Sequence, residues 1–349
     1  MIDLSNMIGK SSKKLGLLFV KSNSVNQLLQ SQIHSLLKSY PQFQLEEVTH
    51  PKYSEFASMP AKDDIKVVVT VSNFTLINEV MKECKNIDWV HCYTTGCDKI
   101  LSDEAFRKSP ITITISRGIS ATGLSEFAIG AMLYFSRKFR EWDRLQQQST
   151  WSQLYATDIS RKRVAIVGYG RIGSKIGKIC KYGFEMSVVA VKNKLEESFK
   201  ITNPEVDAVY KLDELGKAVE GADFVISVLP GGKETDDAFN LDVFKKMKKS
   251  AVFISIGRGS NVDEDALIFA LKENMIAGAA LDVFKTEPLP KTSPFYTDEE
   301  LKEKIFITCH KANASEAVEE ESVRFAKANL DAYLVGQPLD GLVDKSLGY

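Results

Sequence analysis

The sequence predicts an α/β protein in which two doubly wound parallel sheets are covered by helices. Short β-branched runs alternate with helical stretches along the chain, which is the pattern of parallel sheets with helices packed on them. The chain has 349 residues, and at roughly 150 residues per domain this length indicates two domains. The hydrophobic fraction of 44% and the charged fraction of 26% are those of an ordinary globular protein.

The first series of strands and helices occupies the first third of the chain. Its predicted strands are Leu15–Val20, Val67–Val71, Trp89–Tyr93 and Ile111–Ile115. Apolar residues at helical spacing predict a helix over Ser24–Ser39. A long helix is expected to follow over Gly123–Gln147.

The second series begins at Arg163. Its predicted strands are Val164–Val167, Val188–Val191, Phe224–Val228, Val252–Ile256, Ala279–Val283 and Ile305–Thr308. Helices are expected from the end of the first strand to Tyr182 and near Glu214–Val219, Leu241–Lys248 and Asp263–Glu273. The stretch Glu287–Leu301 is rich in proline and charge, so we predict a surface loop there.

Charge and cysteine content exclude several classes of protein. The net charge of −1 gives no basic excess for nucleic acid or for an anionic membrane surface. No apolar run approaches the roughly 20 residues of a membrane helix, and Met1–Lys14 lacks the apolar core of a signal peptide. The five cysteines form no CxxC pair, so we expect no disulfide framework and no metal site. We therefore expect a cytoplasmic protein with neither a nucleic acid nor a membrane as its partner.

A glycine-rich turn joins the first strand of the second series to a helix. It reads Gly168-Tyr169-Gly170-Arg171-Ile172-Gly173, and this GxGxxG pattern between a strand and a helix predicts a dinucleotide site. The first glycine permits the tight turn, the second lets the backbone approach a pyrophosphate, and the third allows close helix–sheet packing. The helix N-terminus then offers unpaired N–H groups to the phosphates. A turn that binds nothing is the alternative.

The next strand ends in Lys192-Asn193-Lys194. NAD enzymes usually carry Asp or Glu at this place, to bind the ribose 2′-hydroxyl. Lysine or asparagine would instead donate hydrogen bonds to a 2′-phosphate, which favours NADP(H) over NAD(H). The lysines could also be a solvated strand end, and the nearby Glu196 and Glu197 keep NAD(H) open.

Three charged residues follow successive predicted strands: Arg258, Glu287 and His310. Ligands of open α/β sheets bind at the carboxyl ends of strands. Arginine suits a carboxylate, histidine transfers protons near neutral pH, and a carboxylate orients a neighbouring imidazole and favours its protonated form. Reduction of a small 2-oxo acid requires this combination beside a hydride donor. We expect the other histidines, His34, His50 and His91, to be structural or exposed.

At these residues the chain resembles the D-isomer-specific 2-hydroxyacid dehydrogenases, a family that includes glyoxylate/hydroxypyruvate reductases, D-lactate dehydrogenases and phosphoglycerate dehydrogenases. The matching segments are Val167–Gly173, Leu229-Pro230 with Glu234-Thr235, Ile256–Glu264, Leu281–Pro290 and Thr308-Cys309-His310, with weaker matches at Thr95–Asp98 and Ser125-Glu126. The resemblance extends from about Val67 to about Leu330.

The resemblance implies roles for individual residues. Arg258 would bind the substrate's carboxylate and carbonyl, His310 would be the acid for reduction, and Glu287 would pair with His310. Asp282 would contact the nicotinamide carboxamide, and Pro230 would lie beside the cofactor. Backbone groups of Val71, Ser72, Asn73, Thr95 and Gly96 would bind the substrate.

The resemblance also implies an architecture. A Rossmann-type NAD(P)-binding domain over residues 123–316 would be inserted into a flavodoxin-like substrate domain formed by residues 1–122 and 317–349. Members of the family are usually dimers, so we expect a homodimer whose interface includes the helix predicted over Gly123–Gln147.

The substrate stays open within the class of glyoxylate, hydroxypyruvate and pyruvate. Cys309 stands where the family commonly has proline, and Lys311-Ala312-Asn313 replaces a small apolar run. The alternative function is an NAD(P)(H)-sensing protein of the same fold that recruits partners. A formate-type dehydrogenase is less favoured, because that group is expected to have glutamine where Glu287 stands.

Overall fold

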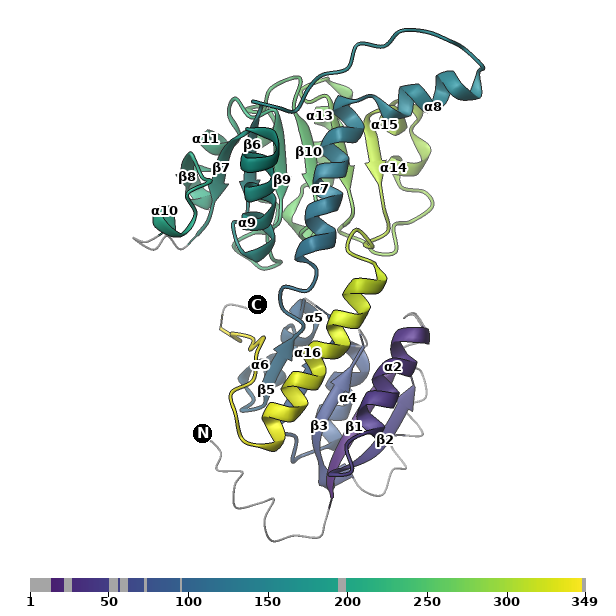
Figure 1. Cartoon of the computed structure of the whole chain (residues 1–349), viewed down its shortest axis with the longest axis vertical. Coiled ribbons are helices and arrows are strands. Elements are labelled where there is room, and N and C mark those ends of the chain that lie inside the picture. The colour runs from purple at the N-terminus through teal and green to yellow at the C-terminus, as the bar shows by residue number, and fades with distance from the viewer. Residues whose placement is uncertain are drawn as a thin grey trace. The chain divides into compact units, whose positions relative to one another are not determined.

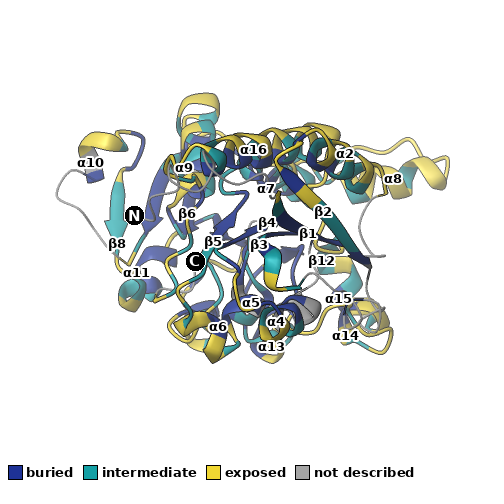
Figure 2. Ribbon diagram, turned by 90° about the horizontal axis from the view of Figure 1, so that it is seen from below, coloured by how far each residue is buried: buried dark blue, intermediate teal, exposed yellow. Residues whose placement is uncertain are grey.

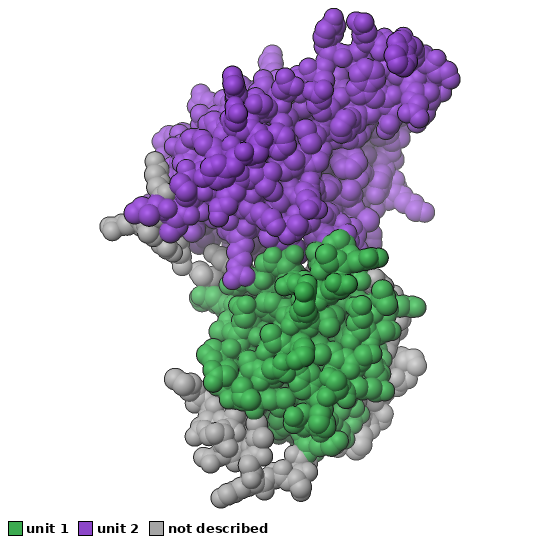
Figure 3. All heavy atoms as spheres, viewed as in Figure 1, with its two compact units in different colours: residues 1–119, 315–349 green, residues 120–314 purple. Residues whose placement is uncertain are grey.

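The computed structural model describes residues 14–21, 27–49, 56, 62–71, 74–94, 96–193 and 199–346. It divides into two compact units (Figure 3). The first unit consists of residues 1–119 and 315–349, and the second consists of residues 120–314. The chain therefore leaves the first unit, completes the second and returns.

The first unit is built on a five-stranded parallel sheet. Its strands are β1 (Leu15–Lys21), β2 (Phe43–Thr49), β3 (Ile65–Thr70), β4 (Trp89–Cys92) and β5 (Thr112–Ile115). Their order is β2-β1-β3-β4-β5, which is the flavodoxin-like order. The predicted flavodoxin-like α/β architecture is confirmed.

Helices cover both faces of this sheet. They are α2 (Gln27–Lys38), η1 (Lys62–Asp64), α4 (Phe74–Glu83), α5 (Asp98–Leu101), α6 (Glu104–Lys108) and α16 (Glu316–Leu334). Helices α2 and α16 lie side by side on one face (Figure 1), where Trp89 stacks on Tyr333 with the ring centroids 5.2 Å apart. Helices α4, α5 and α6 bury their apolar residues against the other face. Burial on both faces explains why these strands are continuous apolar runs in the sequence.

The second unit is built on a seven-stranded parallel sheet. Its strands are β6 (Arg163–Val167), β7 (Ser187–Val191), β8 (Ala208–Tyr210), β9 (Phe224–Ser227), β10 (Val252–Ser255), β11 (Gly278–Leu281) and β12 (Ile305–Ile307). The order β12-β11-β10-β9-β6-β7-β8 is the Rossmann order with one added strand at the β12 edge. The order reverses between β6 and β9, and ligands of such sheets bind at this point of reversal.

The helical elements of the second unit also form two layers. They are α7 (Ala121–Ser136), α8 (Phe139–Gln147), α9 (Arg171–Lys178), the π-helical turn η2 (Ile179–Gly183), α10 (Phe199–Thr202), η3 (Leu212–Glu214), α11 (Leu215–Val219), α12 (Leu241–Phe244), η4 (Gly259–Asn261), α13 (Glu264–Lys272), α14 (Pro294–Thr297) and α15 (Glu299–Lys304). Helices α7 and α9 pack on one face, and α11, α12, α13 and α15 pack on the other. Figure 2 shows most strand residues buried and the outer helix faces exposed.

The long helix predicted over Gly123–Gln147 is wrong, because two helices, α7 and α8, occupy this stretch. Lys138 has a left-handed backbone with φ of 58°, which an α-helix cannot contain. The turn directs α8 against another part of the unit. Arg140 donates hydrogen bonds to the backbone carbonyls of Lys302 and Ile305, and its Nε donates to the Tyr134 hydroxyl at 2.9 Å.

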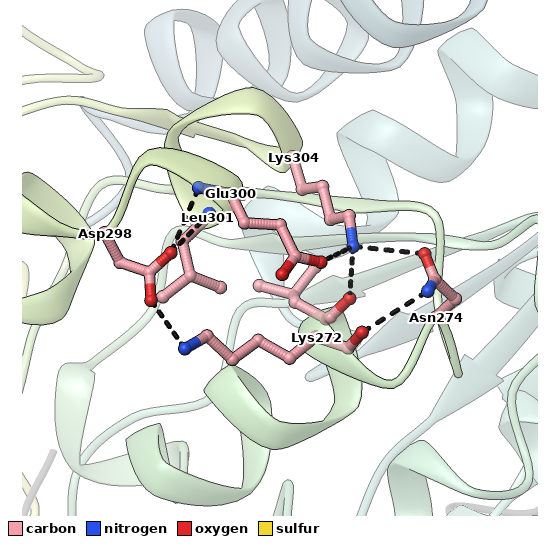
Figure 4. Close-up of polar contacts among 7 residues, drawn as sticks. Lys272, Asn274, Asp298, Glu300, Leu301 and Lys304 are labelled. Carbon is pink, nitrogen blue, oxygen red and sulfur yellow. Dashed lines mark hydrogen bonds and ion pairs between the residues drawn. The ribbon is translucent and has the colours of Figure 1, made fainter.

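The surface loop predicted over Glu287–Leu301 is also wrong in part, because α14 and the start of α15 lie there. Asp298 caps α15 by accepting hydrogen bonds from the amides of Glu300 and Leu301, and Leu301 is fully buried. Figure 4 shows how ion pairs and hydrogen bonds from Lys272 and Lys304 hold this helix against α13. The Lys272 ammonium is the main cause that lowers the pKa of Asp298. Aspartate is a common capping residue, so Asp298 was recognisable in the sequence as a possible helix start. Helix α15 was too short to show helical periodicity.

No helix among the residues described above is long and apolar enough to cross a membrane.

Candidate active site

The glycine turn follows β6 at the point where the strand order reverses. Gly168 has φ of +100°, and a Cβ there would lie 2.6 Å from the Val228 carbonyl oxygen. A Cβ on Gly173 would lie 2.4 Å from the Gly168 carbonyl oxygen. The chain itself therefore requires glycine at the first and third positions of the motif.

Gly170 differs from these two glycines. Its φ of −95° lies outside the left-handed region, and a Cβ there would meet nothing within 4 Å. Neither the backbone nor the packing explains a glycine at this position. The open space instead fits a dinucleotide pyrophosphate, which approaches the backbone at the second glycine of the motif.

Tyr169 lies between these glycines and anchors the turn, a role that the motif did not reveal. Its hydroxyl donates a hydrogen bond to Glu205 Oε1 at 2.9 Å, and both side chains are buried. The hydroxyl occupies the space over Gly177, where a Cβ would lie 2.1 Å from it. Burial, reinforced by Glu205, raises the pKa of Tyr169, so the hydroxyl remains a hydrogen-bond donor.

The end of β7 carries the residues that were expected to distinguish the two cofactors. The Lys192 ammonium lies 5.4 Å from the ring centroid of Phe199. The Asn193 amide donates to Glu234 Oε2 at 3.4 Å, so a carboxylate from the segment after β9 also lies here. Lys194, Glu196 and Glu197 lie outside the described residues.

His310 and Glu287 form a pair of titratable side chains after the carboxyl ends of β12 and β11. His310 Nδ1 lies 2.8 Å from Glu287 Oε2, and Glu287 Oε1 accepts a hydrogen bond from the Phe284 amide at 3.0 Å. The histidine side chain is 45% exposed and the glutamate side chain is 32% exposed. The imidazole is therefore oriented by a fixed carboxylate and still accessible to a ligand.

Asp282, at the end of β11, anchors the segment that carries His310. Its Oδ1 accepts hydrogen bonds from the Thr308 hydroxyl at 2.6 Å and from the amides of Lys311 at 2.8 Å and Ala312 at 3.0 Å. Its carbonyl oxygen accepts one from the His310 amide at 2.8 Å. The family resemblance assigned Asp282 to the nicotinamide, and this anchoring was not predicted.

Arg258 follows β10, and the glycines beside it allow two close approaches. A Cβ on Gly257 would lie 2.5 Å from the Leu229 carbonyl oxygen, and one on Gly259 would lie 1.9 Å from the Phe284 carbonyl carbon. The Arg258 segment therefore lies directly against the segments that carry Pro230 and Glu287.

Asn261 joins these segments and was missed in the sequence. Its Oδ1 accepts a hydrogen bond from the Arg258 amide at 3.1 Å, and its Nδ2 donates to the carbonyl oxygens of Pro230 at 3.0 Å and Thr235 at 3.3 Å. The side chain is fully buried. A buried amide with its donors and acceptor occupied fixes the backbone that it binds, so Asn261 positions Arg258.

Comparison with known proteins identifies the family of this chain. The model of the D-isomer specific 2-hydroxyacid dehydrogenase NAD-binding domain matches residues 129–312. A glyoxylate reductase of Pyrococcus horikoshii is 30% identical over 295 residues, which cover 81% of this chain and 84% of that protein. The chain belongs to the D-isomer specific 2-hydroxyacid dehydrogenase family. It is thus an oxidoreductase of 2-oxo acids with a domain that binds a nicotinamide cofactor.

Two further proteins are similar to large parts of this dehydrogenase. A probable 2-ketogluconate reductase of Dictyostelium discoideum is 33% identical over 239 residues, covering 65% of this chain and 67% of that protein. The crystal structure of a D-isomer specific 2-hydroxyacid dehydrogenase of Xanthobacter autotrophicus has a TM-score of 0.80 at 20% identity, covering 97% of this chain and 100% of that chain. This structural likeness shows the shared fold.

The dehydrogenase's first unit contains the residues whose backbone groups were expected to bind substrate. Val71 is buried, and its amide donates to the Val20 carbonyl oxygen at 3.3 Å. The Gly96 carbonyl oxygen accepts a hydrogen bond from the Thr94 hydroxyl at 2.8 Å. Three of the expected residues lie outside the described part of the chain: Ser72, Asn73 and Thr95.

Two other histidines of the dehydrogenase, His34 and His91, lie on elements of the first unit. His91 is fully buried, with its Nδ1 2.8 Å from the Thr114 hydroxyl, and burial lowers its pKa to about 3. His34 Nδ1 lies 2.5 Å from Glu47 Oε1. His50 lies outside the described residues. Within the described ranges, no three His, Cys, Asp or Glu side chains are grouped so that they could hold a metal ion.

Proposed function

We propose that this dehydrogenase reduces a small 2-oxo acid of the glyoxylate, hydroxypyruvate and pyruvate class. The observation that carries the proposal is the 2.8 Å contact between His310 Nδ1 and Glu287 Oε2. With Nδ1 occupied, Nε2 is the nitrogen that gives a proton to the substrate's carbonyl oxygen during reduction. A bound reduced nicotinamide supplies the hydride to the carbonyl carbon.

Arg258 is proposed to bind the substrate's carboxylate and polarise its carbonyl. A guanidinium offers paired donors that match a carboxylate, and the backbone of Arg258 is fixed by the buried Asn261 side chain. Glu287 is proposed to orient His310 and to stabilise its protonated form. Backbone groups at Val71–Asn73 and at Thr95-Gly96 are proposed to complete the substrate site.

NADP(H) is proposed as the preferred cofactor over NAD(H). Lys192 supplies a cation and Asn193 an amide donor at the end of β7, where a 2′-phosphate would lie. A glyoxylate/hydroxypyruvate reductase of Sinorhizobium meliloti with the same fold, at 21% identity and a TM-score of 0.76 over 96% of this chain and all of that chain, was solved in complex with NADP. The residues proposed to hold the cofactor are Gly168, Gly170, Arg171, Ile172, Gly173, Lys192, Asn193, Lys194, Pro230 and Asp282.

The second unit is proposed as the cofactor domain expected over residues 123–316, and the first as the substrate domain.

A homodimer is proposed through α7, α8 and the segment after them. Large aromatic side chains are exposed there, with Trp151 fully exposed and Tyr155 85% exposed, and exposed apolar clusters mark contact surfaces. All five cysteines are free thiols, which supports the cytoplasm as the compartment.

The test is oxidation of NADPH and of NADH, followed by nicotinamide absorbance, with glyoxylate, hydroxypyruvate, pyruvate and 2-ketogluconate. The proposal predicts turnover with at least one of the first three acids and a higher kcat/KM with NADPH. Turnover only with 2-ketogluconate would refute the substrate class, and a preference for NADH would refute the cofactor. Cofactor binding without any turnover would instead favour the sensing protein.

A further inference from the structure

The segment from Thr308 to Ala312 has an unusual backbone anchor. The residues on both sides of His310 bind one carboxylate oxygen, Asp282 Oδ1, through the Thr308 hydroxyl and through the amides of Lys311 and Ala312. Asp282 is 1% exposed. A carboxylate buried to this extent must be compensated by hydrogen bonds, so these contacts hold the segment in one conformation.

The conformation of His310 depends on these hydrogen bonds to Asp282 more than on packing of its side chain. Its side chain is 45% exposed, and its backbone has φ of 57° in the left-handed region. A non-glycine residue stays in that region only where the surrounding structure fixes it. The amide of His310 is bonded to the Asp282 carbonyl oxygen at 2.8 Å, so the same aspartate holds the residue and its neighbours.

Thr308 is the one side chain among these donors, and its contact with Asp282 Oδ1, at 2.6 Å, is the shortest of the three on that oxygen. The threonine lies directly after β12, and its amide donates to the Leu281 carbonyl oxygen at 2.9 Å. Thr308 therefore links the end of β12 to the end of β11 by a backbone bond and a side-chain bond. Hydrogen bonds to an ionised acceptor are stronger than those between neutral groups.

We infer that Thr308 is a positioning residue for the reaction: its hydroxyl, through Asp282, holds His310 where the imidazole can transfer a proton to the substrate. The inference rests on the proposed role of His310 as the acid. Without the hydroxyl, Asp282 keeps only amide donors from Lys311 and Ala312, and the backbone before His310 loses its side-chain tether. The Glu287 contact then holds an imidazole on a less constrained backbone.

The decisive variants are T308V, which removes the hydroxyl at nearly constant volume, and T308S, which keeps it. T297V is the matched control, because the Thr297 hydroxyl also donates a hydrogen bond, at 3.1 Å to the Ser293 carbonyl oxygen, but on the exposed α14. The measurements are kcat and KM for the 2-oxo acid, the Kd of NADPH from nicotinamide fluorescence, and the isotope effect on kcat with NADPH deuterated at C4. Should T308V fail to fold, T308A replaces it.

T308V is expected to lower kcat by about tenfold to a hundredfold, because small misplacements of a catalytic group have effects of this size. The Kd of NADPH is expected to stay within about twofold, and the isotope effect to rise as chemistry becomes slower. T308S and T297V are expected to match wild type. A structural role alone would lower the amount of folded enzyme without changing the isotope effect.

The outcomes separate this inference from the proposed function. If T308V keeps the wild-type kcat and isotope effect while H310A is inactive, the positioning role is refuted and the proposed acid stands. If H310A itself keeps the wild-type kcat, the proposed acid is refuted and the inference fails with it.

Discussion

Glu287 accepts from the Phe284 amide through one carboxylate oxygen and lies 2.8 Å from His310 Nδ1 through the other. The backbone amide of Phe284 thus fixes the carboxylate in the orientation in which it contacts the imidazole. This arrangement links the loops after β11 and β12 and occupies Nδ1 of His310, so that Nε2 is the nitrogen proposed to face the substrate.

Replacement of Glu287 by glutamine tests that relationship. The amide oxygen of glutamine still accepts a hydrogen bond from Nδ1, but a hydrogen bond to a neutral acceptor is weaker than one to a carboxylate. We expect E287Q to lower kcat by about tenfold or more, because the imidazole is held less firmly for proton transfer. The measurement is kcat and KM for the 2-oxo acid. An unchanged kcat would show that Glu287 does not orient His310 for the reaction.

Gly170 offers a test of cofactor binding that leaves the fold intact. A Cβ there would meet nothing within 4 Å, so G170A is expected to keep the wild-type Tm. NADPH binding is expected to weaken by about tenfold or more, because the added methyl group would occupy the space in which the pyrophosphate approaches the backbone. Fluorescence titration measures the Kd of NADPH for G170A, and thermal unfolding measures its Tm. Binding of NADPH to G170A at the wild-type Kd would place the pyrophosphate elsewhere.

Gly168 provides the matched control for G170A. Its φ is +100° and a Cβ would lie 2.6 Å from the Val228 carbonyl oxygen. We expect G168A to lower the free energy of unfolding by about 1–3 kcal/mol, which is visible as a lower Tm.

Lys192 is expected to set the cofactor preference. K192A should lower the ratio of the kcat/KM values for NADPH and NADH by about tenfold, because a hydrogen bond to a charged phosphate contributes on this scale. K217A is the control, since Lys217 is an exposed lysine of the same unit that pairs with Glu214. Equal ratios for K192A and wild type would assign the preference to other residues.

The buried His91 is expected to make the free energy of unfolding depend on pH. Burial lowers its pKa to about 3, whereas in the unfolded chain it returns to its ordinary value of about 6.5. Between these two values the unfolded chain binds the proton and the folded protein does not. The free energy of unfolding therefore falls as the pH is lowered through this range, by at most about 1.4 kcal/mol per pH unit from this residue.

The H91Q variant removes the titrating group, so its stability is expected to depend less steeply on pH between 6.5 and 3. Chemical denaturation at several pH values measures the slope, and H34Q, which changes a half-exposed histidine paired with Glu47, serves as the control. Parallel curves for wild type and H91Q would mean that His91 is protonated in the folded protein as readily as in the unfolded chain.

Most of the strands could be predicted from the sequence because a parallel strand buried on both faces is a continuous apolar run. Two strands could not. Strand β2 (Phe43–Thr49) is an edge strand that contains Glu46 and Glu47, and β8 is only three residues long. The break between α7 and α8 escaped prediction because Lys138 adopts a left-handed backbone that no local residue type announces.

The candidate site was predictable where its chemistry is local. The glycine motif and the charged residues after β10, β11 and β12 are visible in the sequence because topology places the ends of parallel strands together. Tyr169, Asn261 and Thr308 were not assigned these roles, because their partners Glu205, Pro230 and Asp282 are 36, 31 and 26 residues distant in the chain. Contacts of this kind appear only once the fold is known.

The most direct test of the central claim compares H310A with H34A in the reduction of whichever 2-oxo acid the wild type turns over. The account predicts that H310A loses nearly all of its kcat while binding NADPH with the wild-type Kd, and that H34A stays fully active. A kcat for H310A within about threefold of the wild-type value, far from the loss expected on removal of a general acid, would contradict the assignment of His310 as that acid.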